Sequence, residues 1–380
     1  MDTWDFSPSR LTVARQQREM TKRALAGKIG VSAAAVTYFE DGVHAPSPEN
    51  LERLAQVLDF PIAFFGGDDI QEVPEESVSF RSRRNMSARV RDKTTAYLRL
   101  AAHVISPALH QRYRLPDSDI PDFEGEAPES AAAMTRSYWR LGHGPIANAV
   151  HLLEAKGVHV YWGQDHSPAV DAVSLWRDSR PFVLLNLRTN AGERARFDAA
   201  HELGHLILHR HRDGLSLSEI ESEADRFASA LLLPESQFRV ECPRQPTLAD
   251  LLRLKERWKT SIQAMVRRCR DIGIFSEWQY QSAFRDVSAR GWRKDEPGRL
   301  DREESALQNG VFERMYARGI YSDEFARTLN IPVQLLGELV PATNKYREIR
   351  WEDLPAKYLS IEELGYESNE DVDDEERSAR

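Results

Sequence analysis

The chain has 380 residues, of which 41% are hydrophobic, so we expect two or three domains with buried cores. Its two cysteines, Cys242 and Cys269, exclude a disulfide-based secreted scaffold and are typical of a cytoplasmic protein. We find no signal-peptide pattern and no apolar run near the roughly 18 residues of a membrane span, so no membrane partner is expected. The net charge of −9 does not exclude nucleic-acid binding, because nine acids and two arginines are concentrated in the tail 361–380, which we expect to be solvated and disordered.

Residues 1–67 carry the pattern of five short helices. Pro8 stands in the first turn of the first helix, and capping residues begin the later ones, namely Thr21, Ser32 and Ser47. Apolar side chains at helical spacing predict an inner face, made of Ala24, Leu25, Ile29, Val36, Phe39, Leu51, Leu54, Ala55 and Leu58. Gly30 provides a tight turn between the second and third helices. Two short helices joined in this way indicate an all-α, DNA-binding helix-turn-helix domain.

The run VSAAAVTYFEDGVHAPSPENLERLAQVLDFP resembles the XRE/Cro-type repressor domain. This resemblance assigns the reading of DNA to the third helix, with contacts from Ser32, Ala33, Ala34, Thr37 and Tyr38. Small side chains and Thr suit contact with thymine methyl groups, while Ser, Thr and Tyr can reach phosphates. Members of the family usually carry Gln after the Thr that begins the second helix. This chain has Lys22 there, and we expect it to make a charge contact with phosphate.

Double-stranded DNA is therefore the expected partner of residues 1–67, and the XRE-type resemblance implies that the chain binds it as a homodimer. Between positions 10 and 28 there are six basic residues and one acidic residue, a surplus of positive charge that suits phosphate neutralisation. The basic residues are Arg10, Arg15, Arg18, Lys22, Arg23 and Lys28. The alternative interpretation is a small helical protein-binding module, because Ala33 and Ala34 offer few contacts to bases.

Shifts in composition divide the rest of the chain. The expected parts, in order, are an acidic linker at 66–79, a helical connector at 80–115, a second linker at 116–130, an α+β domain at 128–240 and a mainly helical regulatory or docking domain at 247–345. Within the α+β domain, alternating Val158, Val160 and Trp162 predict a strand. The apolar runs on both sides of Arg177–Arg180 predict a β-hairpin.

The sequence His201-Glu202-Leu203-Gly204-His205 is an H-E-x-x-H motif within an apolar helical run. Residues four apart lie on one helix face, so His201 and His205 can bind one metal ion while Glu202 projects beside them. Zinc lowers the pKa of bound water to roughly 7, and an adjacent carboxylate can accept the proton during attack on a carbonyl. Gly204 costs the helix about 1 kcal/mol relative to Ala, so we expect a close approach there by the cleft wall or a substrate backbone.

A third metal ligand is expected from a second helix. Glu221 and Asp225 are four residues apart, so Glu221 can bind the metal while Asp225 holds a ligand histidine in the required tautomer. Glu223 lies about 200° round the helix from Glu221, so both cannot reach one ion. We predict Glu221, with Glu223 as the main rival. His211 has the offset of the third histidine in another class of zinc peptidase, but Leu208 replaces the glycine which that class requires.

The runs RARFDAAHELGHLILH and ESEADRFASALLLP strongly resemble the ImmA/IrrE-type metallopeptidases, over roughly residues 75–300. The resemblance implies a zincin-like peptidase core in which Zn²⁺ is bound by His201, His205 and Glu221, with Glu202 as the general base. Members of that family are known or suspected to cleave helix-turn-helix repressors.

We therefore expect a multidomain protein: an all-α helix-turn-helix domain, an α+β zincin-like core and a mainly helical C-terminal domain. Its expected function is that of a DNA-binding transcriptional regulator whose zinc endopeptidase cleaves a repressor or antitoxin, the chain itself included, in a stress or phage-related response. The alternative is a non-proteolytic, antitoxin-like repressor that uses the peptidase fold to sense a ligand or nucleic acid.

Overall fold

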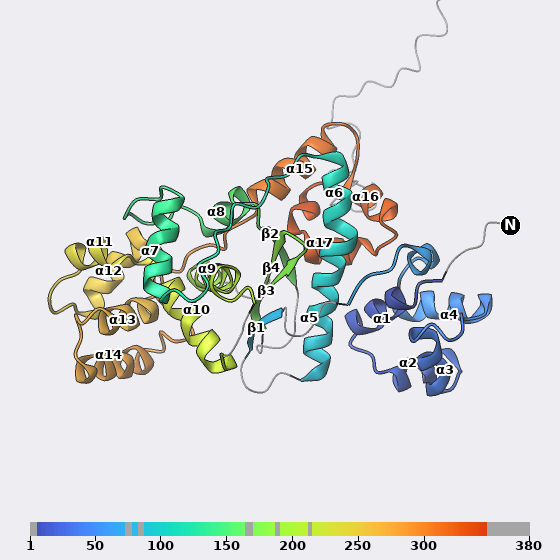
Figure 1. Cartoon of the computed structure of the whole chain (residues 1–380), viewed down its shortest axis with the longest axis horizontal. Coiled ribbons are helices and arrows are strands. Elements are labelled where there is room, and N and C mark those ends of the chain that lie inside the picture. The colour runs from blue at the N-terminus through green and yellow to red at the C-terminus, as the bar shows by residue number, and fades with distance from the viewer. Residues whose placement is uncertain are drawn as a thin grey trace, which may run out of the picture.

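The computed structural model describes residues 6–72, 78–82, 87–163, 170–186, 191–211 and 215–347. The predicted acidic tail lies outside these residues. Figure 1 shows a multidomain molecule in which a helical N-terminal part and a larger helical part lie on opposite sides of a small sheet and the long helix α5. None of the helices in the described ranges is long and apolar enough to cross a membrane.

The N-terminal part consists of four α-helices and a 3₁₀ helix: α1 (Pro8–Gln17), α2 (Lys22–Ile29), α3 (Ala33–Glu40), α4 (Pro48–Leu58) and η1 (Ile62–Gly66). The predicted caps are confirmed, because the side chains of Thr21, Ser32 and Ser47 each accept a backbone hydrogen bond from the first turn of their helix. Gly30 has φ +76°, the left-handed conformation that the turn requires. The predicted inner face is correct except at Ala24, which is exposed, while Ala26 is buried in its place.

The connector begins as a strand and continues as one long helical rod. It contains β1 (Val78–Ser82), α5 (Ala88–Leu100), the π-helical turn η3 (Ala101–Ile105) and α6 (Ser106–Arg112). The prediction of a helix from residue 80 was wrong at its start, because β1 pairs with a strand of the sheet. Helix α5 packs on α1, where Lys93 Nζ lies 3.2 Å from Glu19 Oε2. The buried Arg99 donates to the carbonyl of Ile70, which attaches the end of the N-terminal part to this rod.

The sheet has four strands in the order β1-β3-β4-β2, with β2 (His159–Gly163), β3 (Val170–Arg177) and β4 (Arg180–Asn186). Strands β3 and β4 form the predicted antiparallel hairpin, and β2 is parallel to β4. Successive side chains point to opposite faces, so the sheet separates two cores. One face contributes Val160, Trp162, Ala172, Val183 and Leu185, and the other contributes Tyr161, Val173, Leu175, Phe182 and Leu184.

The first core lies between the sheet and eight helices. These are α7 (Pro128–Tyr138), α8 (Ala149–Ala155), α9 (Gly192–Leu208), α10 (Leu217–Leu232), α11 (Glu235–Glu241), α12 (Leu248–Trp258), α13 (Ile262–Asp271) and α14 (Glu277–Ala289). Together with the sheet they form the expected α+β core.

The second core joins the other face of the sheet to the connector, the N-terminal part and the last helices of the described chain. Those helices are α15 (Ala306–Tyr316), α16 (Ser322–Thr328), α17 (Val333–Leu339) and η4 (Pro341–Lys345). The structure therefore differs from the predicted division at residue 247. Helices α12 to α14 share a core with α9 and α10, whereas α15 to α17 belong with α5.

Candidate metal centre and nucleic-acid interface

Two adjacent helices, α9 and α10, carry the predicted metal site. Helix α9 is buried along almost its whole length, and a capping box between Ser216 and Glu219 begins α10. Gly204 allows the two helices to approach closely, because a Cβ atom there would lie 3.1 Å from a ring carbon of Phe227 and 3.3 Å from the Cα of Ala224. The glycine is thus explained by the neighbouring helix, and not by a cleft wall or substrate as the sequence analysis expected.

Three ligand atoms of the predicted set converge between these helices. His201 Nε2 and His205 Nε2 are 2.9 Å apart, and Glu221 carboxylate oxygens lie 3.5 Å from the first and 3.4 Å from the second. Ligands bound tetrahedrally to zinc at about 2.0 Å are separated by roughly 3.3 Å, so this triangle has the size that a zinc ion requires. The donor set, two imidazoles and one carboxylate, is also one that zinc binds.

The protonation states in the site favour a bound cation. Burial lowers the pKa of His205 to about 3, which keeps its imidazole neutral and able to donate a lone pair. Burial alone would raise the pKa of Glu221, but hydrogen bonds from His201 and His205 outweigh burial and lower that pKa to about 2. Glu221 is therefore an anion at neutral pH. Glu202, the predicted general base, follows His201 on α9 and is fully buried.

The structure places Asp225 where the sequence analysis expected it, behind His201. Asp225 Oδ1 lies 2.9 Å from His201 Nδ1, the ring nitrogen that faces away from the metal site. Its other oxygen accepts a hydrogen bond from Arg267 on α13, at 3.1 Å. The sequence analysis did not predict the role of Arg267. Its helix follows α10 and α11 much later in the chain, and the residues around Arg267 do not indicate a contact with Asp225.

Glu223, the rival third ligand, lies behind His205 instead. His205 Nδ1 is 3.1 Å from His209 Nδ1, and His209 Nε2 is 2.9 Å from Glu223 Oε2. Sequence reasoning treated His209 as a polar residue at the helix end, yet it is buried at 3% exposure. The missed signal was its i, i+4 spacing from His205, which places both on one helix face. His211 does not belong to the ligand triangle; it is exposed and paired with Glu124.

The predicted DNA-reading helix α3 presents a small exposed surface. Ser32, Ala33, Ala34 and Tyr38 are exposed, while Val36 and Phe39 anchor the helix in the core. The Thr37 hydroxyl donates to the carbonyl of Ala33 at 3.2 Å, which leaves its methyl group for contact with a base. The surface that α3 offers to DNA is thus largely apolar.

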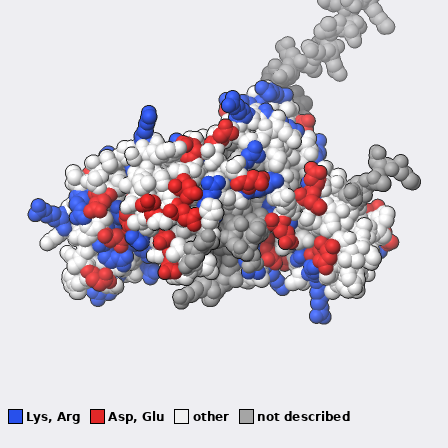
Figure 2. All heavy atoms as spheres, viewed as in Figure 1, with Lys and Arg blue, Asp and Glu red and all other residues white. Residues whose placement is uncertain are grey.

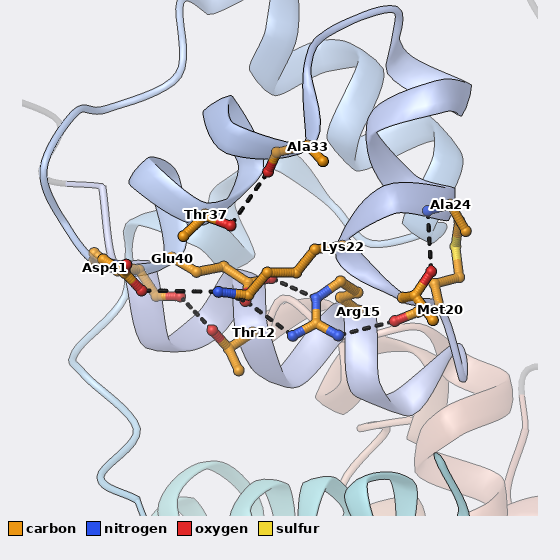
Figure 3. A network of polar contacts seen from close by, with 11 residues as sticks. Thr12, Arg15, Met20, Lys22, Ala24, Ala33, Thr37, Glu40 and Asp41 are labelled. Carbon is orange, nitrogen blue, oxygen red and sulfur yellow. Dashed lines mark hydrogen bonds and ion pairs between the residues drawn. The ribbon is translucent and has the colours of Figure 1, made fainter. Parts of the chain in front are cut away.

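Lys22 lies in a polar network that joins α1, α2 and α3 (Figure 3). The buried Glu40 receives two hydrogen bonds from Arg15, at 2.5 and 2.9 Å. Lys22 Nζ is 3.5 Å from Glu40 and 3.8 Å from Asp41. A phosphate that binds Lys22 would therefore compete with two carboxylates of the domain itself.

The basic surplus between positions 10 and 28 is partly structural, which corrects its interpretation as a phosphate-binding surface. Arg10 and Arg15 are buried, and Arg10 donates to the carbonyls of Phe64 and Asp68. Arg18 binds the end of α4 through the carbonyl of Leu58. On the face that Figure 2 shows, basic and acidic side chains are interspersed over the molecule. The surplus that remains at the surface comes from α2, at Lys22, Arg23 and Lys28.

Comparison with protein-family models identifies two parts of the chain. Residues 153–270 match the model of the IrrE N-terminal-like domain, and residues 13–65 match a helix-turn-helix model. The first match covers three of the four strands, β2, β3 and β4, and the helices from α9 to α13, which include both helices of the candidate metal site. No curated protein matches the chain.

Proposed function

We propose that this chain, which joins an XRE-type helix-turn-helix domain to an IrrE/ImmA-like peptidase domain, is a DNA-binding transcriptional regulator and a zinc-dependent endopeptidase. Its substrate class is a helix-turn-helix repressor or an antitoxin, with the chain itself among the candidates, in a stress or phage-related response. The observation that carries the proposal is the convergence of His201, His205 and Glu221, with the buried Glu202 next to His201 along α9.

His201, His205 and Glu221 would hold Zn²⁺, which when bound polarises a peptide carbonyl and acidifies water. Asp225 would accept a hydrogen bond from the Nδ1–H group of His201 and so keep Nε2 directed at the metal. Glu202 accepts a proton from the attacking water as the new bond to the carbonyl carbon forms. The same carboxyl then gives that proton to the amine nitrogen when the C–N bond breaks.

The N-terminal domain would bring this activity to an operator. Residues 1–67 would bind double-stranded DNA through α3 and the start of α2, as a homodimer on a palindromic site. In the described structure α3 keeps an exposed face while α1 packs on α5, so DNA can reach the reading helix with the rest of the chain attached. Analytical ultracentrifugation with and without operator DNA tests the dimer.

The proposed peptidase activity is tested with matched proteins, wild type and Glu202→Gln. Each is loaded with zinc and incubated with the full-length chain and with helix-turn-helix repressors encoded beside its gene. We expect wild type to cut one of these proteins at a defined bond and Glu202→Gln, with the same zinc content, to cut none. If wild type cuts none of them, the alternative of a non-proteolytic regulator that senses a ligand replaces this proposal.

A further inference from the structure

A pocket lies among the helices that surround the first core. It has a volume of about 740 Å³, is open to solvent and is lined by α7, α10, α11 and α13, helices that lie at the end of the molecule remote from the helix-turn-helix domain (Figure 1). That volume is within the range of roughly 300–1,000 Å³ that is typical of small-molecule sites.

The walls of this pocket carry an excess of positive charge. Four arginines line it, Arg136, Arg140, Arg239 and Arg268, against two acids. Both acids already have partners: Glu129 binds Arg226 through two hydrogen bonds of 2.7 and 2.9 Å, and Glu235 binds Arg239 at 2.6 Å. Among the described residues neither acid forms an ion pair with Arg136, Arg140 or Arg268, although both act on Arg268 through space.

Two of these arginines are buried without a carboxylate partner among the described residues. Arg136 and Arg268 are only 4% and 3% exposed. Arg136 donates to three backbone carbonyls, including that of Leu231 at 2.5 Å, and Arg268 donates from Nε to the carbonyl of Leu233 at 2.9 Å. Burial lowers the pKa of Arg136 to about 10 and also lowers that of Arg268, yet a pKa of about 10 leaves a guanidinium charged at neutral pH.

Buried charges are normally paired, because desolvating an isolated ion is costly. We propose that this pocket binds a phosphate-bearing small molecule, whose anionic oxygens pair with Arg136 and Arg268. The planar guanidinium group matches phosphate with two parallel hydrogen bonds. His143 carries the one aromatic ring of the described lining, and the four arginines make phosphate the group that the charge of the pocket favours.

The same helices connect the pocket to the metal centre. Arg268 lines the pocket, while its neighbour Arg267 donates to Asp225, which holds His201. A ligand that shifts α13 would therefore move the contact behind a zinc ligand. We infer that the two sites are thermodynamically linked, so phosphate changes zinc affinity and zinc changes phosphate affinity by the same factor.

Isothermal titration of the full-length protein with inorganic phosphate tests the pocket, with acetate at equal ionic strength as the comparison anion. We expect one phosphate per chain and binding of acetate at least about tenfold weaker. Ser137 is exposed and lines the pocket, so it offers a matched pair of variants that leaves the core intact. Ser137→Glu adds a repelling carboxylate and should weaken phosphate binding about tenfold or more, whereas the uncharged Ser137→Gln should retain it. Absence of phosphate binding, or equal binding by the two variants, overturns the proposal.

The link is tested by measuring zinc affinity against a chromophoric chelator, with and without saturating phosphate. We expect a change of about fivefold or more in wild type and in Ser137→Gln, and none in Ser137→Glu. The readout is metal affinity, so it does not depend on the proposed peptidase activity. An unchanged zinc affinity in wild type would show that the two sites are independent.

Discussion

The proposed metal centre and the proposed DNA-reading helix are built in opposite ways. Around the metal centre, each ligand histidine has a partner on its far side, Asp225 for His201 and His209 for His205. On α3 the exposed predicted contacts are two alanines and Tyr38, and the Thr37 hydroxyl donates within the helix. The side chains of the candidate metal centre are thus held in position by other residues of the protein. The exposed face of α3 would gain its polar partners from the DNA.

This difference predicts how each region responds to substitution. In a preorganised site the side chains are held in one geometry, so removing one of them causes a large loss of metal affinity or of cleavage rate at that site. Removing one contact from an exposed helix loses that contact alone. The following substitutions, ordered from the largest expected effect to the smallest, test this contrast.

Glu202→Gln should lower the rate of substrate cleavage by about 10²–10⁴-fold, because the proton acceptor is lost while shape and ligands remain. Metal content and thermal unfolding should match those of wild type. Cleavage at the wild-type rate would show that another group accepts the proton.

Glu221→Gln should weaken zinc binding by more than about 100-fold, since the loss of a direct ligand exceeds the roughly 10–100-fold effect of an outer partner. Glu223→Gln makes the same chemical change on the same helix. It should reduce affinity by about tenfold at most, because Glu223 reaches the site only through His209. Competition with a chelator compares the two variants, and a reversed order would make Glu223 the ligand.

Glu40→Gln should destabilise the N-terminal domain by roughly 3 kcal/mol, because it leaves the buried Arg15 without its anion. Glu49→Gln is the control, since its pair with Arg53 is exposed and should contribute less than about 1 kcal/mol. Hydrogen exchange of α1 and α3 amides in the full chain measures both. Equal protection in the two variants would mean that the Arg15–Glu40 pair adds no stability.

Thr37→Ala or Tyr38→Ala should reduce the preference for operator over unrelated DNA by about 1–3 kcal/mol, while Lys22→Ala should weaken binding to all sequences and reduce the salt slope by about one. Fluorescence anisotropy at several salt concentrations separates these effects. Undetectable or salt-independent binding by wild type would indicate that this domain docks a protein instead.

The sequence predicted most of the features that depend on local chemistry. Capping by Thr21 and Ser32, the turn at Gly30 and the hairpin round Arg177–Arg180 follow from residue type and spacing, and the structure contains all of them. The position of His201 and His205 on one face of the helix follows from helical periodicity.

The rest depends on long-range packing, which spacing does not encode. Arg267 is 42 residues from Asp225 in the chain, and the sequence around either residue does not predict their contact. The strand β1 was missed because its pairing partner lies far along the sequence. Arg10 and Arg15 were interpreted as surface charge because composition does not show which arginines fold inward.

The central claim is that His201, His205 and Glu221 bind one zinc ion. Metal analysis of the purified chain combined with zinc X-ray absorption spectroscopy tests it most directly. We predict one zinc per chain, coordinated by two imidazole nitrogens and a carboxylate oxygen. A metal-free protein that takes up no zinc, or a shell containing a third imidazole from His209 or His211, would contradict the account.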